Sequence, residues 1–158
     1  NRSSCEDAVN LINVEGNINN IEIKNSLSDG LDIDFSRLKI DNLDILSSLN
    51  DCLDLSYGEY KLINLNLSRC GDKGLSVGEK SFLVINKINV NEADTGIAIK
   101  DGSIATIEHL NVKKTIKCIH VYRKKQEFSG AVANLKSVKC HDGKIEKQEG
   151  SFINRNTL

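Results

Sequence analysis

The chain has 158 residues, of which 39% are hydrophobic and 27% charged, and its formal net charge is −1. This composition is that of a folded domain with a sizeable core, and it excludes a disordered or fibrous chain. A nearly neutral chain has no electrostatic basis for binding nucleic acid, which we do not expect as a partner. No segment approaches the roughly 20 apolar residues of a membrane span, so we expect none.

A repeat of 22 residues organises most of the chain. Short runs with apolar residues at every second position begin at Gly30, Cys52, Gly74, Gly96 and Cys118. Alternation with a period of two is typical of strands, and none of these runs has the spacing of a helix. Three short strands with tight turns fill such a repeat, and repeats of this kind stack so that each strand pairs in parallel with its copies.

The pattern predicts an all-β solenoid, a right-handed parallel β-helix of about six 22-residue coils. We expect a weak first coil over 8–29, four regular coils over 30–117, and a sixth over 118–139 that is disturbed at 126–130. Residues 140–158 leave the pattern and are expected to cap the open end of a single domain, 1–158. Because the sequence begins without Met, we expect it to belong to a longer protein with an additional N-terminal domain.

Two further features favour the β-helix over a leucine-rich repeat. A leucine-rich repeat has a helix or a long irregular segment after its one strand, whereas strand patterns fill the whole repeat here. Asparagines also recur once per repeat, at Asn20, Asn42, Asn64 and Asn86. Amides on neighbouring coils, roughly 4.8 Å apart, can hydrogen-bond as a ladder inside a turn.

Three segments of the chain carry a resemblance to known modules: residues 71–78 (GDKGLSVG), 96–103 (GIAIKDGS) and 122–128 (YRKKQEF). With them, residues 29–130 resemble β-helix modules of bacterial proteins, which are attached to spore-coat-protein-H-like kinase domains and other surface-associated proteins. The resemblance implies a right-handed, pectate-lyase-like β-helix and an extracellular or cell-surface location. It implies little about activity.

The first strand of each coil presents a possible acidic site. If Leu31 and Ile33 face the core, Asp32 faces outward, and Asp54 lies on the same face one coil later. The two Cα atoms are expected about 4.8 Å apart. The pair could share a Ca²⁺ ion, or act as the carboxyl groups of a retaining glycosidase. A solvated acidic face is the structural alternative, and we expect no cofactor other than calcium.

Five charged residues on or beside this face are candidate substrate-binding residues: Asp54, Lys73, Lys100, Asp101 and Arg123. A lyase or epimerase would need a base that faces the carboxylates, and Lys73 is close enough to Asp54 for this role. This pair is the best catalytic option, although we assign no catalytic residue. Glu79, Asp101 and Arg123 share one phase of the repeat, so they form either an ion ladder or part of an anion-binding patch. The departures from the family pattern at Ile99 and Gly102 weigh against a motif-based role for Lys100 and Asp101.

Aromatic residues make up only 4% of the chain and include no Trp. Ligand sites are usually lined by aromatic side chains, so this scarcity disfavours a sugar-processing groove. Tyr57, Tyr60 and Tyr122 are the candidate platforms, and ordinary packing at a turn is the alternative for each.

Five cysteines leave at least one thiol free or paired outside the chain. Cys118 and Cys140 are one repeat apart, and three interpretations stay open for them. They form a disulfide, bind zinc with the histidines that closely follow each of them, or stay reduced. Cys52 and Cys70 have no cysteine one coil away and are predicted to be buried small residues.

Two hypotheses of function follow. The first is a non-catalytic structural or ligand- or glycan-binding module of a larger surface-associated protein, with a polysaccharide or protein partner. The second is a carbohydrate-active enzyme, a lyase, hydrolase or epimerase, that uses the face with Asp32, Asp54 and Lys73. Scarce aromatic residues favour the first, whereas a deep cleft with perturbed carboxylates would favour the second.

Overall fold

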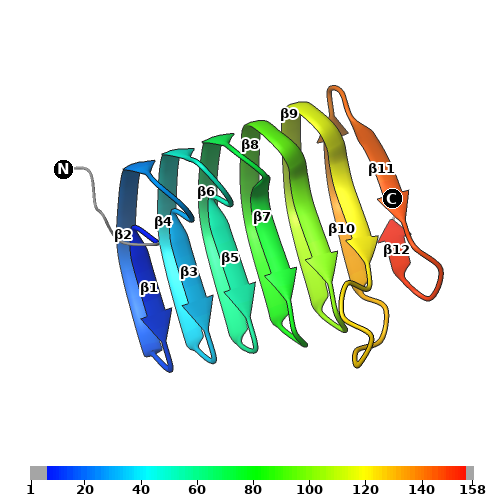
Figure 1. Cartoon of the computed structure of the whole chain (residues 1–158), viewed down its shortest axis with the longest axis horizontal. Coiled ribbons are helices and arrows are strands. Elements are labelled where there is room, and N and C mark those ends of the chain that lie inside the picture. Colours follow the sequence, from blue (N-terminus) through cyan, green and yellow to red (C-terminus); the bar gives the residue numbers. More distant parts are fainter. Residues whose placement is uncertain (1–6, 156–158) are drawn as a thin grey trace.

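The computed structural model describes residues 7–155, which form twelve strands and no helix that could cross a membrane (Figure 1). The strands stack as a right-handed parallel β-helix of about seven turns, which confirms the predicted fold class. Their bounds are β1 (Val9–Ile12), β2 (Glu15–Ser26), β3 (Leu31–Asp34), β4 (Arg37–Ser48), β5 (Leu53–Ser56), β6 (Glu59–Cys70), β7 (Lys73–Gly78), β8 (Phe82–Lys100), β9 (Ile104–Tyr122), β10 (Val132–Cys140), β11 (Lys144–Lys147) and β12 (Phe152–Arg155).

Two rows of parallel strands build the solenoid (Figure 1). One row contains β1, β3, β5 and β7 and continues through the last residues of β8 and β9 to β11. The other begins with β2, β4 and β6 and continues through the first residues of β8 and β9 to β10 and β12. Most strands of the second row are long because they continue around a corner of the coil while their backbone hydrogen bonds to the neighbouring coils are kept.

The register explains where the 22-residue repeat holds and where it fails. The sequence offset between register partners on successive coils is 22 from β1 to β7. One additional residue precedes β8, so the offset between β6 and β8 is 23. The original frame returns at Thr95, the partner of Lys73. Asn64 therefore pairs with Lys87, and the prediction that Asn86 extends the asparagine ladder is wrong.

Two ladders of polar side chains run along the outside of the second row. Asn42 Nδ2 donates to Asn20 Oδ1 at 2.9 Å, and Asn64 Nδ2 donates to Asn42 Oδ1 at 3.2 Å, on the exposed surface of strands rather than inside a turn. A second ladder escaped the sequence reasoning because the sequence offsets between its members, 22, 23, 22 and 30, are unequal. Its side chains are joined by hydrogen bonds of 2.7–3.2 Å and belong to Asp44, Asn66, Asn89, Asn111 and His141.

The core is a stack of aliphatic columns, one residue of each column per coil. The inward residues of the first row, such as Leu31, Leu53 and Leu75, are fully buried. Gly96 lies inside β8 where a side chain does not fit, since a Cβ atom there would lie 2.6 Å from the carbonyl oxygen of Cys118. Truncation of such a core leucine to alanine typically lowers stability by about 2–5 kcal/mol.

Buried serines organise the turn that follows four of the first-row strands. The hydroxyl of each accepts a backbone N–H of the preceding coil at 2.9–3.5 Å. The four serines are Ser36, Ser81, Ser103 and Ser151. The last residue of the motif segment 96–103 therefore has a structural task, because it satisfies a backbone donor that the buried turn would otherwise leave unpaired.

Two disulfides connect strands of the solenoid. Cys118 and Cys140 are bonded, with Cα atoms 5.9 Å apart, so the disulfide interpretation is correct and the thiols cannot bind zinc. Cys140 lies in register with Val112 rather than with Cys118, so the bond does not follow the frame of the repeat. Cys52 and Cys70 are also bonded, with Cα atoms 5.3 Å apart. They are buried, but the prediction that they are unlinked is wrong, because the bond crosses one turn of a single coil.

The C-terminal part departs from the regular coil in two places. The sequence offset between register partners in β9 and β10 is 28, and the additional residues form the loop 123–131, where the sequence predicted a disturbance. Residues after Cys140 continue the stack as short strands: β11 pairs with β9, and β12 pairs with β10. Cys5 and residues 156–158 of the expected cap lie outside the described residues.

Candidate functional site

The first row of strands presents the surface that we call the first-strand face. Its central column of outward side chains consists of Asn10, Asp32, Asp54, Ser76, Ala98, His120 and Glu146. Asp32 and Asp54 are direct register partners, as predicted. The column is acidic toward the N-terminal strands and neutral in the middle.

Five aspartates on β3, β5 and the turns before them form what we call the acidic cluster: Asp29, Asp32, Asp34, Asp51 and Asp54. Hydrogen bonds orient several of them. Asp29 Oδ1 accepts from Asn50 Nδ2 at 2.7 Å and from the Asp51 backbone N–H at 2.9 Å. Asp32 Oδ2 accepts from Asn10 Nδ2 at 3.0 Å. Asp51 is buried and the other four are partly buried, and all five lie on adjacent coils, so the carboxylates are close enough to influence one another.

Burial and mutual repulsion make these carboxyl groups reluctant to ionise. Burial, followed by the charges of Asp34 and Asp54, raises the pKa of Asp32 to about 7. Burial raises the pKa of Asp51 to about 6, although the Lys73 ammonium opposes this shift. The pKa of Asp29 is raised as well, chiefly by burial. Near neutral pH, the cluster therefore holds protons that a nearby cation would displace.

The sequence predicts Lys73 beside Asp54, but the two side chains form no ion pair. Its ammonium lies 3.3 Å from Asp51 Oδ1 and also binds the carboxylate of Asp72. Asp54 Oδ1 is buried and has no hydrogen-bond partner among the described residues. The expected base is therefore held by two other carboxylates and is not directed at Asp54.

Lys100 and Asp101 are buried, and their contacts are structural. Lys100 is 5% exposed, and its Nζ donates to Ser76 Oγ at 2.8 Å. It lies across Gly78, where a Cβ atom would be 2.8 Å from Lys100 Cε. Asp101 Oδ1 accepts the backbone N–H groups of Lys124 and Lys125 at 2.6 and 2.8 Å. Lys100 therefore holds the Ser76 side chain in place, and Asp101 holds the loop 123–131 in place.

The predicted ion ladder of Glu79, Asp101 and Arg123 does not form. Glu79 instead binds Lys125 Nζ at 2.7 Å and accepts from Ser56 Oγ at 2.5 Å. The Arg123 side chain is exposed and belongs to no ion pair of residues 7–155, while its backbone N–H donates to the Gln148 side chain. The additional residues of the loop 123–131 shift the sequence out of the regular frame, so Lys125 takes the place that the pattern gave to Arg123.

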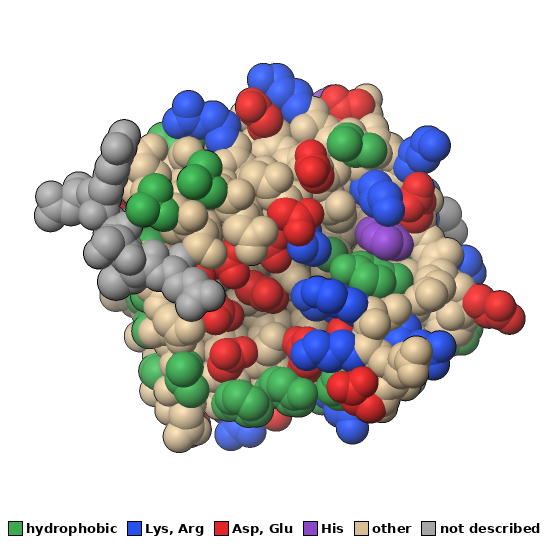
Figure 2. Space-filling model, in the orientation of Figure 1, with side chains coloured by type: hydrophobic (Ala, Val, Ile, Leu, Met, Phe, Trp, Pro, Cys, Tyr) green, Lys and Arg blue, Asp and Glu red, His purple; other side chains and the backbone are tan. Residues whose placement is uncertain are grey.

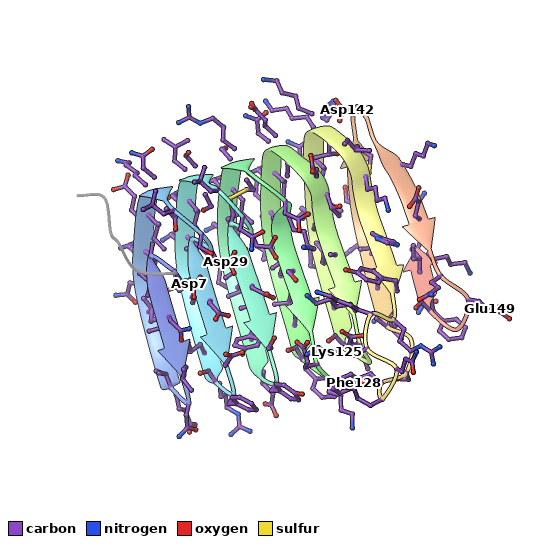
Figure 3. All side chains as sticks on the ribbon, viewed as in Figure 1. Asp7, Asp29, Lys125, Phe128, Asp142 and Glu149 are labelled. Carbon is purple, nitrogen blue, oxygen red and sulfur yellow. A yellow bond between two sulfur atoms is a disulfide. The ribbon has the colours of Figure 1, made fainter. Side chains whose placement is uncertain are left out.

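Aromatic side chains border the face along the turns after β3 and β5. The rings of Phe35 and Tyr57 are stacked with centroids 4.7 Å apart, and the Phe128 ring from the loop 123–131 lies 6.3 Å from that of Tyr57. Figure 3 shows Phe128 and Lys125 close together at the lower edge of the solenoid. Tyr60 is buried, and its hydroxyl contacts the carbonyl oxygens of Ile33 and Ser56, which is ordinary packing.

Tyr122 also packs within the protein, on the C-terminal half of the first-strand face. Its ring stacks on His120 with centroids 4.1 Å apart. A shallow hollow of about 510 Å³ lies beside this pair and the residues of β11. A larger groove, of about 720 Å³, is formed on the second row of strands by residues that include Arg37, Tyr60 and Phe82. Neither hollow is lined by Asp32 or Asp54.

The described residues provide no third His, Cys, Asp or Glu ligand beside Asp32 and Asp54 for the predicted calcium ion. Among residues 7–155, no group of three or more His, Cys, Asp or Glu side chains is placed to hold a metal ion. Asp32 and Asp54 supply oxygen ligands from neighbouring strands, but calcium takes six to eight such ligands. The calcium site stays a prediction.

Comparisons with known proteins leave the site to be interpreted from its own chemistry. The chain matches no protein-family model, no curated protein and no solved structure.

Proposed function

We propose that the chain is a non-catalytic structural and binding module of a larger extracellular or cell-surface protein. Its ligand would be a positively charged group of a protein or polysaccharide partner, bound by the acidic cluster. One observation carries the proposal: of the five carboxylates, only Asp51 has an ion-pair partner among the described residues. Four carboxylates on two adjacent coils thus lack internal compensation, and a cation would relieve their repulsion.

The shape of the face agrees with binding rather than catalysis. The acidic cluster lies on a row of parallel strands, and the hollows at other places on the surface are open. An enzyme gains much of its rate from charged groups in a site that excludes water. The four carboxylates other than Asp51 are instead partly exposed, so a large partner can reach them.

The disulfides support the proposed location. Disulfides form and persist in oxidising compartments and are rare in the cytosol. The bonds Cys52–Cys70 and Cys118–Cys140 link buried or half-buried sulfurs, so they belong to the folded structure. An extracellular or cell-surface protein is the simplest setting for them.

Binding to charged oligomers tests the proposal. Calorimetric titration at pH 8 and low salt should show binding of hexalysine or an amino-sugar oligomer, and none of polygalacturonate. The variant Asp32→Asn/Asp54→Asn should weaken binding at least tenfold, because it removes two charges from the cluster. The variant Glu22→Gln/Asp41→Asn removes two charges elsewhere, both paired with nearby lysines, and should bind normally. Equal losses in both variants would contradict the proposal.

A second candidate, a retaining glycosidase, is favoured by one observation. Asp32, whose pKa is raised to about 7, stands one coil from Asp54, and a proton donor beside a carboxylate is the constellation of that reaction. The test is release of reducing ends from neutral and acidic polysaccharides. Hydrolysis that Asp32→Asn abolishes would establish the enzyme and displace the binding module, whereas intact polysaccharides would leave the binding module in place.

A further inference from the structure

We propose that the partner of the acidic cluster is a second copy of this chain, bound antiparallel through the first-strand face. The inference rests on the proposed function, because it names the partner of the same surface. The first argument is the distribution of charge along the solenoid. Residues 7–79 contain 13 Asp and Glu against 6 Lys and Arg, a net charge of −7, whereas residues 80–155 contain 14 Lys and Arg against 8 Asp and Glu, a net charge of +6.

The first-strand face shows the same division. In Figure 2, acidic side chains gather over the N-terminal strands of this face, and basic side chains follow toward the C-terminal strands. The basic half comprises residues of β9, β11 and the loop between β9 and β10: Lys117, Arg123, Lys124 and Lys144. Of these four, only Lys117 is in an ion pair among the described residues, with Glu146 at 3.0 Å. Both halves of the face therefore carry charge that the molecule does not compensate internally.

A twofold axis brings the two halves together. The face consists of seven parallel strands, of which β7 is the middle one. Rotation about an axis along β7 places β3 opposite the end of β9 of the other copy. Asp29 then faces Lys117, and Asp32 faces His120. Each contact occurs twice, because a twofold interface is isologous.

The middle of the face presents little charge to a partner. The outward side chains there, Ser76 of β7 and Ala98 on the next strand, are uncharged and fully buried, so a partner would contact the residues around them. Lys73 lies near the axis, but Asp51 and Asp72 neutralise its ammonium. A parallel arrangement would instead place the acidic cluster of one copy on that of the other, and a staggered arrangement would cover only half of the face.

Sedimentation of the full chain at low and high salt is the first test. At 20 mM salt we expect a dimer, and at 500 mM salt a monomer, because attraction between surface charges is screened over a few ångströms at high ionic strength. A monomer at every salt concentration, with protein at 100 µM, would overturn the inference.

Charge reversal tests the geometry. Asp29→Lys/Asp34→Lys changes the net charge of residues 7–79 from −7 to −3, and Lys124→Glu/Lys144→Glu changes that of residues 80–155 from +6 to +2. Each variant alone should therefore dimerise more weakly than the wild type. An equimolar mixture should form a heterodimer in preference to either homodimer, because the unchanged basic half of one variant then faces the unchanged acidic half of the other.

A matched control and the opposing outcome complete this test. Lys87→Glu/Lys139→Glu, a reversal of equal size outside this face, should leave the dimer intact. The side chains of Lys124 and Lys144 are exposed and belong to no ion pair among the described residues, so their reversal should not disturb folding. A dimer dissociation constant that is unchanged in Lys124→Glu/Lys144→Glu would exclude this interface.

The outcomes also separate this inference from the proposed function. If the wild type stays monomeric but binds hexalysine, and Asp32→Asn/Asp54→Asn removes that binding, the acidic cluster is a binding site for another partner and only the inference is wrong. If hexalysine does not bind either, both fail.

Discussion

At the scale of single residues, Asp32 shows how neighbouring coils change the chemistry of a surface position. Its pKa of about 7 lies well above the roughly 3.9 of an unfolded aspartate, so the folded state binds more protons between these values. The free energy of unfolding therefore decreases as the pH rises from about 4 to about 7, because the unfolded state releases its proton first. The opposite slope would hold for a carboxylate stabilised by a cation.

The first prediction follows from this linkage. Asp32→Asn should raise the free energy of unfolding at pH 8, where the wild type has an ionised carboxylate beside Asp34 and Asp54, and should change it little at pH 4. Urea denaturation at the two pH values measures the difference. Asp41→Asn, which removes an exposed carboxylate paired with Lys39, should not reproduce this dependence on pH. Equal effects of Asp32→Asn at both pH values would contradict the raised pKa.

The asparagine ladder gives a second prediction with a matched control. Asn64→Leu should lower the free energy of unfolding by about 1 kcal/mol, the usual net contribution of a hydrogen bond, because the amide donates to Asn42. Asn86→Leu should have a smaller effect, because Asn86 is exposed and lies outside the ladder. Chemical denaturation of both variants measures the difference. Equal midpoints would mean that the hydrogen bond of the ladder contributes no stability.

At the scale of structural elements, the turns hold the strands at their ends. The Cys52–Cys70 bond closes a loop with a sequence separation of 18 residues, from the start of β5 to the end of β6 in one coil. Cross-links of this loop length typically stabilise a protein by about 3 kcal/mol. Cys52→Ala/Cys70→Ala should therefore lower the free energy of unfolding by about that amount. A reducing agent should destabilise the wild type more than the variant, and an equal effect on both would mean that the bond contributes nothing.

The loop 123–131 offers a test of the motif residues. Asp101 is fully buried and accepts two backbone N–H groups of the loop, so Asp101→Ala should cost about 2–3 kcal/mol of stability. Arg123→Ala should be nearly neutral, because its side chain is exposed. Thermal denaturation compares the two. A neutral Asp101→Ala would restore the view that this residue is free to bind a substrate.

At the scale of the whole molecule, each coil contacts only its neighbours, so stability is distributed along the axis. Solenoids of this kind open from their ends, where a coil has one neighbour instead of two. Amide hydrogen exchange should be slowest in β6, β8 and β9 and fastest in β1 and β12. Uniform protection along the chain would indicate that all coils unfold as one unit.

The distribution of charge along the solenoid is the second property of the whole molecule. A chain with a formal net charge of −1 divides into an acidic and a basic half because charged residues are sorted along the sequence, and a solenoid preserves that order in space. A globular fold would have mixed the two groups. The association of two copies proposed above depends on this preservation.

The sequence by itself determined the coil. Apolar residues at every second position, recurring once per repeat, are enough to select parallel strands and to fix which side chains face inward, so Asp32 and Asp54 could be placed one above the other. The disturbance at 126–130 was visible as well, because local composition interrupts the alternation. These features are local or strictly periodic, and such patterns need no knowledge of long-range contacts.

Only the tertiary structure decided how residues outside the frame meet. The additional residue before β8 moved Asn86 out of the ladder, and the longer loop after β9 gave Lys125 the position expected for Arg123. The partner of Cys52 proved to be Cys70, across a turn rather than one coil away. A repeat specifies what lies one period away, whereas contacts across turns and irregular loops depend on the path of the chain in space.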